Sequence, residues 1–244
     1  MGKRLSEVEI KHFADVGFLR VPAVIPPDLI IAAKSSLETD LKRPSGPYYK
    51  DTKGMAYKLY GLLERGSAYE DIIRMPILLD VLEDLLGPDL VYTRNRHNHG
   101  SLNQTGHNAD GLHRDVLRGE YVSVIVYLEE VTPENGPTIV IPGSHRWSYA
   151  PDQSDGIFLD SIAFAEYRGL AVQAVPILAG PGDLLLFEGV LFHTAQKNTS
   201  GKTRASLVLG YRAVDELNGV IDRTECLVRG RDLYRGNVVV PRRS

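Results

Sequence analysis

The sequence is poor in cysteine, in long apolar runs and in net charge. Its single cysteine, Cys226, excludes a disulfide within the chain and fits a reducing compartment. No apolar run resembles the core of a signal peptide or reaches the length needed to cross a bilayer. The formal net charge of −3 gives no reason to expect nucleic acid or an anionic membrane as a partner. We therefore expect a soluble cytoplasmic protein, and the sequence does not predict its oligomeric state.

Helix signals dominate the first third of the 244-residue chain. Ser6 and Glu9 have the spacing of a capping box before a short helix that Gly17 ends, and residues 18–21 follow as a short strand. A second helix opens at Pro26-Pro27, and a third is expected between about residues 73 and 86 because leucines and isoleucines recur there at one-turn spacing. Residues 43–56 are rich in Gly, Pro, Tyr and Lys, which predicts a loop.

From Leu90 the pattern changes to short strands separated by Gly and Pro. Residues 97–112 are polar and rich in Gly and Asn, whereas residues 121–128 give the strongest strand pattern. In that strand Val122, Val124 and Val126 share one face, predicted to meet the helices, and the Tyr/Ser face is predicted to line a cavity. Further strands are expected at residues 90–96, 138–141, 171–177, 183–188, 190–194 and 204–212.

This order of elements predicts a single α+β, mainly β domain over residues 1–244 whose centre is a β-sandwich or barrel. Residues 1–89 form a mainly helical support layer and residues 90–212 form the core. Within the core, residues 148–171 are an insertion that lacks clear periodicity. Residues 213–244 are predicted to form a C-terminal cover, and this tail and the insertion are the candidate substrate lids.

His113 and Asp115 stand two apart in a segment expected to be extended, so their side chains point to the same side. One further imidazole, for which His193 is the candidate, completes a face of two histidines and one carboxylate that holds ferrous iron with open positions for other ligands. Arg204 and Ser206 follow on one strand face, where a planar guanidinium and a hydroxyl suit the far carboxylate of a 2-oxo dicarboxylate. The His-x-Asp tripeptide alone is common. The prediction therefore rests on the ordered set of His113, Asp115, His193, Arg204 and Ser206 along the chain.

The ordered set resembles the phytanoyl-CoA dioxygenase family of Fe(II)/2-oxoglutarate oxygenases. The similarity covers roughly residues 6–212, through His113-Arg-Asp115, the segment 134–146, Gly182-Asp183, His193 and Arg204. It implies a double-stranded β-helix (jelly-roll, cupin-like) core with the N-terminal helices packed on one sheet. It also implies Fe(II) held by His113, Asp115 and His193, and 2-oxoglutarate held by Arg204 and Ser206. Ile125 corresponds to a tryptophan that some members use against the cosubstrate.

The resemblance further implies the use of O2 and the release of succinate and CO2. Related halogenases have a small residue where this chain has Asp115, so hydroxylation or another outcome of C–H abstraction (epimerisation, desaturation or cyclisation) is expected. A small-molecule metabolite of bacterial secondary metabolism is the expected substrate. Candidate pocket residues, besides the metal and cosubstrate ligands, are Tyr121, Ser123, Tyr127, Asn103, Gln104 and His97.

Two hypotheses of other classes stay open on the sequence. A zinc-dependent hydrolase would use His97, His99 and His113 and would have no need of Arg204. A non-catalytic jelly-roll binding module would be expected to lack one of the ligands or the arginine. A positive rim of Arg94, Arg96, Arg114 and Arg118 near the site would be compatible with an anionic substrate.

Overall fold

The computed structural model describes residues 4–51, 53–93, 97–104, 106, 111–116, 121–148, 157–216 and 225–232. Helix α1 (Glu7–Val16) begins after the N-cap Ser6 and ends at Gly17, which confirms the predicted capping box. At Gly17 φ is +82°, and a Cβ there would lie 2.5 Å from His145 and 2.8 Å from Leu191. Only glycine fits this turn. The turn directs β1 (Phe18–Val21) into antiparallel pairing with β9 (Leu184–Glu188).

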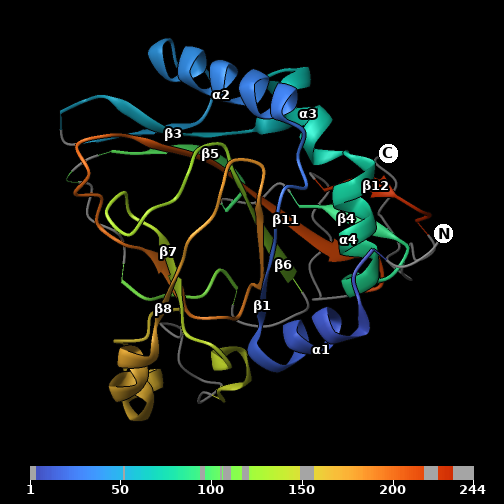
Figure 1. Ribbon diagram of the computed structural model, residues 1–244, viewed down its shortest axis with the longest axis vertical. Helices are drawn as coiled ribbons and strands as arrows, with labels where there is room; N and C mark the ends of the chain where they lie inside the picture. Colours follow the sequence, from blue (N-terminus) through green and yellow to red (C-terminus); the bar gives the residue numbers. More distant parts are fainter. Residues whose placement is uncertain are drawn as a thin grey trace, which may run out of the picture.

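Two antiparallel sheets face each other and form the centre of the molecule (Figure 1). The large sheet has the order β1-β9-β6-β11-β5-β3-β2, with β4 and β12 joined beside β11. The small sheet has the order β10-β7-β8. This arrangement confirms the predicted double-stranded β-helix. The remaining strands are β2 (Tyr48–Lys50), β3 (Ala56–Tyr60), β4 (Leu90–Tyr92), β5 (His99–Asn103), β6 (Tyr121–Tyr127), β7 (Thr138–Val140), β8 (Val175–Ile177), β10 (His193–Ala195), β11 (Arg204–Ala213) and β12 (Cys226–Arg229).

Helices cover the outer face of the large sheet, as predicted (Figure 1). They are α2 (Pro27–Lys42), α3 (Ser67–Ile73) and α4 (Pro76–Leu86), with a short 3-10 turn at Leu62–Glu64. Val122, Val124 and Val126 of β6 belong to the apolar core between this sheet and the helices. The opposite face of β6, with Ile125, meets the small sheet in a second apolar cluster. The alternation read from residues 121–128 is therefore confirmed.

The insertion packs its own aromatic cluster against the small sheet. Its described part contains a 3-10 helix (Ile162–Gln173), and a second 3-10 turn covers Ser144–Arg146. The rings of Trp147 and Tyr167 stack at 4.7 Å, and the ring of Phe164 meets Phe192 edge-on at 4.8 Å. The described part of the insertion thus packs its aromatic side chains onto residues that flank the small sheet.

The structure corrects three predicted segments and places a strand in a stretch for which none was predicted. The predicted loop 43–56 contains β2, which pairs with β3, and the polar stretch 97–112 contains β5, which pairs with β3 and β11. Backbone pairing, rather than an apolar pattern, holds these two strands. The expected helix at 73–86 is shorter and is preceded by α3, because Pro76 starts α4 at its first turn. The strand expected from 171 begins only at Val175, after the 3-10 helix.

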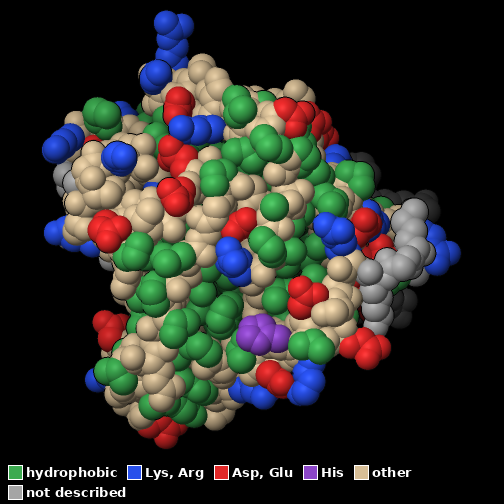
Figure 2. Space-filling model, viewed as in Figure 1, with side chains coloured by type: hydrophobic (Ala, Val, Ile, Leu, Met, Phe, Trp, Pro, Cys, Tyr) green, Lys and Arg blue, Asp and Glu red, His purple; other side chains and the backbone are tan. Residues whose placement is uncertain are grey.

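The described parts of the C-terminal tail, residues 213–216 and 225–232, do not line the cavity. There β12 pairs with β4, and the Arg229 guanidinium binds Asp80 and Glu83 of α4 at 2.6 and 2.9 Å. The single-domain boundaries and the covering role of the tail stay predictions. No helix in the described ranges is both long and apolar enough to cross a membrane. Figure 2 shows acidic and basic side chains interspersed on the face it presents.

Candidate metal centre and cosubstrate cavity

The segment that carries His113 and Asp115 is extended and is held on both sides by backbone pairing. His113 exchanges two backbone hydrogen bonds with His193, at 3.0 and 2.9 Å, and the Asp115 amide donates to the Gly189 carbonyl at 2.8 Å. On the other side, the Arg114 amide donates to the Ile157 carbonyl at 2.9 Å. This pairing places His113 directly opposite His193, at the start of β10.

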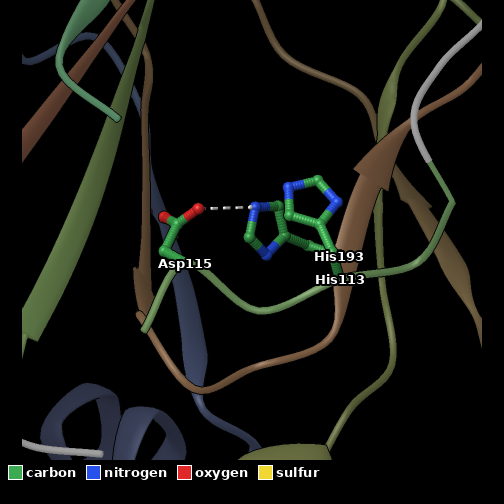
Figure 3. A group of neighbouring side chains, drawn as sticks. All are labelled: His113, Asp115 and His193. Atoms are coloured by element: carbon green, nitrogen blue, oxygen red, sulfur yellow. Dashed lines mark ion pairs between the residues drawn. The ribbon is translucent and has the colours of Figure 1, made fainter. Parts of the chain in front are cut away.

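His113, Asp115 and His193 form the one group of at least three potential metal-ligating side chains among the described residues. Their ligand atoms all lie within 4.8 Å of one another. Figure 3 shows the three side chains pointing toward one another, with His193 Nε2 3.5 Å from Asp115 Oδ1. Asp115 and His193 are buried, and His113 is partly exposed. Two imidazoles and one carboxylate on a common side form a set that suits a divalent transition metal.

The backbone fixes which nitrogen of each imidazole faces the centre. The Nδ1 atom of His113 lies 2.8 Å from the Gly111 carbonyl, and that of His193 lies 3.0 Å from the Leu191 carbonyl. A carbonyl can only accept, so each Nδ1 carries a proton, and Nε2 is the nitrogen of each ring that presents a lone pair when the imidazole is neutral. Carbonyl partners of this kind orient metal-binding histidines.

Asp115 is held by two neighbours besides His113 and His193. Its Oδ2 accepts a short hydrogen bond from the Ser123 hydroxyl, and its Oδ1 lies 2.9 Å from His97 Nδ1. Burial alone would raise the pKa of Asp115, but the nearby His193 and His97 outweigh it and hold that pKa well below its usual range. The group is therefore a carboxylate, as a metal ligand must be.

Arg204 begins β11 and is almost fully buried, at 4% exposure. It lies 5.8 Å from the ring centre of Tyr127, and its Nε and Nη1 atoms have no hydrogen-bond partner among the described residues. Burial lowers the pKa of Arg204. A buried cation with unused donors is costly unless an anion meets it. The arrangement therefore fits a carboxylate ligand.

A cavity of about 510 Å³ joins the metal group to Arg204. Ser206, Asn103, His97 and Ile125 also line it. The Ser206 hydroxyl lies 3.4 Å from that of Ser101, and the buried Oδ1 of Asn103 has no partner among the described residues. The three metal-group residues, Arg204, Ser206 and two of the other pocket candidates therefore open into one space.

The remaining pocket candidates lie outside this lining. Hydroxyls of the Tyr/Ser face of β6 are used elsewhere: that of Tyr121 binds Asn98 at 3.3 Å, and that of Tyr127 binds Thr138 at 3.2 Å. Ser123 binds Asp115, and Gln104 does not reach the cavity. Because the small sheet packs against this face, only Ile125 of its residues on β6 borders the open space.

Two further expectations differ from the structure. Arg114 is not on a rim: it is 1% exposed, stacks between Phe164 and Phe192 at 4.6 Å from each ring centre, and donates to two backbone carbonyls. The other three rim arginines lie outside the described residues. The zinc hypothesis fails geometrically, because His99 turns its Nδ1 to the His97 carbonyl at 2.8 Å and does not join a cluster with His113.

Sequence reasoning missed much of the far side of the cavity. Tyr49 and Tyr57 of the β2–β3 region and Ile157 and Phe158 of the insertion line it as well. The available signal was the four tyrosines within residues 48–60, which a loop interpretation of residues 43–56 concealed.

Comparison with known proteins gives consistent matches. Residues 13–206 match the sequence profile of the family described as phytanoyl-CoA dioxygenase (PhyH). The chain is 27% identical over 221 residues to dioxygenase af480 of Aspergillus fumigatus, covering 83% of this chain and 65% of that protein. It is 32% identical over 160 residues to the ectoine dioxygenase of Sphingopyxis alaskensis, covering 56% and 51% respectively. The matched regions span less than two thirds of both relatives' own lengths.

In structure, the chain is similar to SnoN, a non-heme alpha ketoglutarate dependent epimerase from nogalamycin biosynthesis. The TM-score is 0.74 at 16% identity, and the superposition covers 92% of this chain and 98% of that one. At this level of identity the similarity shows a shared fold.

Proposed function

Because the chain belongs to the phytanoyl-CoA dioxygenase family, we propose that it is an Fe(II)- and 2-oxoglutarate-dependent oxygenase acting on a small-molecule metabolite. One observation carries the proposal: the group of His113, Asp115 and His193 opens into the same cavity as the buried guanidinium of Arg204. A metal face alone would suit several chemistries. A metal face with a carboxylate anchor beside it suits a 2-oxo dicarboxylate cosubstrate.

In this proposal Fe(II) is held by His113 Nε2, His193 Nε2 and an oxygen of Asp115. The fit rests on the two Nε2 lone pairs and on the ionised carboxylate. 2-Oxoglutarate is held through its far carboxylate by Arg204, with Ser206 adding a hydroxyl from the same face of β11. The unused donors of Arg204 support this assignment.

Iron and 2-oxoglutarate, when bound, supply an O2-derived oxidant that takes hydrogen from an unactivated C–H bond, and 2-oxoglutarate leaves as succinate and CO2. The chain's own residues orient the ligands and keep water out. The Gly111 and Leu191 carbonyls fix the two imidazoles, and Ser123 with His97 fixes the carboxylate. Ile125 and Phe187 give the cavity apolar walls beside the metal group.

Asp115 determines the expected type of reaction. Its carboxylate fills the coordination position that a halide would need, so hydroxylation is proposed in preference to halogenation. Epimerisation, desaturation and cyclisation share the same first hydrogen abstraction, and the similarity to an epimerase of this fold keeps them as alternatives. We further propose a role in bacterial secondary metabolism and a cytoplasmic location. The single cysteine supports that location.

Anaerobic addition of Fe(II) and 2-oxoglutarate to the purified protein tests the proposal. A weak visible charge-transfer band should appear, and it should be lost in His113→Ala and His193→Ala. His12→Ala, which changes an exposed histidine on α1, should keep the band. Absence of the band in the unmodified protein, with zinc recovered instead, would contradict the oxygenase assignment. Asp115→Gly should keep the circular dichroism spectrum and abolish hydroxylation.

A further inference from the structure

Residues 157–159 of the insertion run beside the segment that carries the metal ligands. Two backbone hydrogen bonds of 2.9 Å join the two segments. In this antiparallel pairing Phe158 stands directly opposite His113, which stands directly opposite His193. Residues directly opposite each other in an antiparallel pair lie on the same face of the sheet. Phe158 therefore continues the row of the two imidazoles by one strand.

The side chain of Phe158 forms part of the cavity wall. It lines the cavity, and its ring centre lies 6.0 Å from that of His113. The next residue, Leu159, turns the other way into a buried apolar cluster, as strand alternation requires. Phe158 is 44% exposed, whereas Phe187, the other phenylalanine in this wall, is buried. Phe158 thus presents an open apolar ring beside the metal group, where a ligand can cover it.

The cations of the cavity stand elsewhere, on the large sheet. Ser206 on β11 stands opposite Ser101 on β5, and Ser101 stands opposite Lys58 on β3. The two hydroxyls of this second row lie 3.4 Å apart. Arg204 is two residues from Ser206, on the same face of β11. Lys58 and Arg204 therefore both lie at the cosubstrate end, where a dicarboxylate balances their charges.

The other acidic and basic side chains in the described part of the cavity wall have roles of their own or carry no charge. Asp115 and two of the histidines belong to the metal group, and His97 Nδ1 lies 2.9 Å from Asp115 Oδ1. Burial, together with the nearby Lys58, holds the pKa of His99 well below its usual range, so that imidazole is neutral. Among the described residues, the wall beside Phe158 therefore offers a ligand apolar contacts and no charged partner.

We propose that Phe158 is a specificity-determining residue, and that an uncharged, apolar ring of the substrate lies against it. Neighbouring strands are about 4.8 Å apart, so a ring on Phe158 is one strand from His113 and presents its C–H bonds to the metal group. The cavity of about 510 Å³ has room for such a ring beside the short cosubstrate. A charged group on the ring would lose its hydration without gaining a partner. This inference rests on the proposed function, because it takes the row of Lys58 and Ser206 as the cosubstrate end.

Two probes of the same shape test the inference by calorimetry under nitrogen, with Fe(II) and saturating 2-oxoglutarate present. They are the neutral 2-naphthamide and the anionic 2-naphthoate. 2-Naphthamide should bind about tenfold or more tightly than 2-naphthoate, because only the carboxylate needs a charged partner. Phe158→Ala should weaken 2-naphthamide by roughly two- to tenfold, the range expected for loss of an aromatic contact. Phe158→Lys should reverse the order of the two probes, because it supplies the missing cation.

Matched variants show whether the effects are specific. Val172→Ala changes an exposed apolar residue of the nearby 3-10 helix that does not line the cavity, and it should change neither affinity. Phe158→Tyr keeps the ring and should keep the preference for 2-naphthamide. No binding of 2-naphthamide, tighter binding of 2-naphthoate by the parent protein, or an unchanged affinity in Phe158→Ala would overturn the inference. So would a loss of 2-oxoglutarate rather than 2-naphthamide in Phe158→Ala. The charge-transfer band, recorded on the same samples, separates these failures from failure of the proposed function, which a missing band would indicate.

Discussion

Replacing Arg204 by methionine should have opposite effects on the protein with and without cosubstrate. Arg204 is 4% exposed, and two of its three guanidinium nitrogens have no hydrogen-bond partner among the described residues. Methionine has a similar length and no charge, so it removes the cost of an uncompensated buried cation. Without 2-oxoglutarate we therefore expect Arg204→Met to unfold at the same temperature as the parent protein or a higher one.

With 2-oxoglutarate the order should reverse. A ligand present at a hundred times its Kd stabilises the folded state by about 2.7 kcal/mol, which for a chain of this size raises Tm by roughly 5 to 11 °C. The parent protein should show this rise in the presence of Fe(II) under nitrogen. Arg204→Met should show almost none, because the far carboxylate of the cosubstrate loses its bidentate partner.

Differential scanning fluorimetry with Fe(II), with and without 2-oxoglutarate, measures both effects. Arg43→Met, which changes an exposed arginine after α2, is the control and should keep the full rise. Fe(II) affinity, measured separately, should be nearly the same in Arg204→Met and in the parent. An undiminished 2-oxoglutarate effect in Arg204→Met would refute the anchor role. A large fall in Tm without cosubstrate would show instead that Arg204 is needed for the fold itself.

Three further substitutions probe the support of the site. Ser123→Ala removes a hydrogen bond to Asp115 and should weaken the affinity for Fe(II), measured by anaerobic titration, by about 10- to 100-fold. An unchanged affinity would contradict the role of Ser123 in holding Asp115. Arg114→Met removes two hydrogen bonds to carbonyls. It should lower the free energy of unfolding, measured in urea, by about 2 kcal/mol and speed chymotrypsin cleavage of the insertion. If neither effect is observed, Arg114 does not anchor the insertion. His99 has a depressed pKa in the folded state, so below about pH 6.5 the unfolded chain binds a proton that the folded one does not, and stability falls with falling pH. His99→Gln should therefore reduce that slope, by at most about 1.4 kcal/mol per pH unit, and an unaltered slope would exclude His99 as its source.

Local rules account for what the sequence predicted well. The capping box at Ser6 and the glycine at position 17 bound α1 because caps depend on near neighbours in the chain. The two faces of β6 follow from strand alternation. The same alternation places His113 and Asp115 on one side and turns Arg114 to the other. His193 was already the candidate for the third ligand, and the family resemblance supported it, because no local rule links it to His113.

What the sequence did not predict depends on contacts between distant segments. The strands β2 and β5 have polar or mixed compositions and exist because β3 and β11 offer backbone partners. Tyr121 and Tyr127 were expected in the pocket, but the packing of the small sheet on their face diverts their hydroxyls to other partners. Arg114 was expected in solvent because the aromatic cluster that buries it forms only when the insertion folds back.

The pairing of residue 113 with residue 193 has a consequence for the order of events in folding. The two histidines meet across a backbone bridge that closes a long loop, and Asn103 meets Arg204 across a longer one. Contacts of such large sequence separation form slowly, because loop-closure entropy must be overcome before they stabilise anything. During synthesis, β10 and β11 also leave the ribosome long after residue 113. The metal group can therefore assemble only when both sheets have closed, so acquisition of iron would be a late event that reports a completed fold.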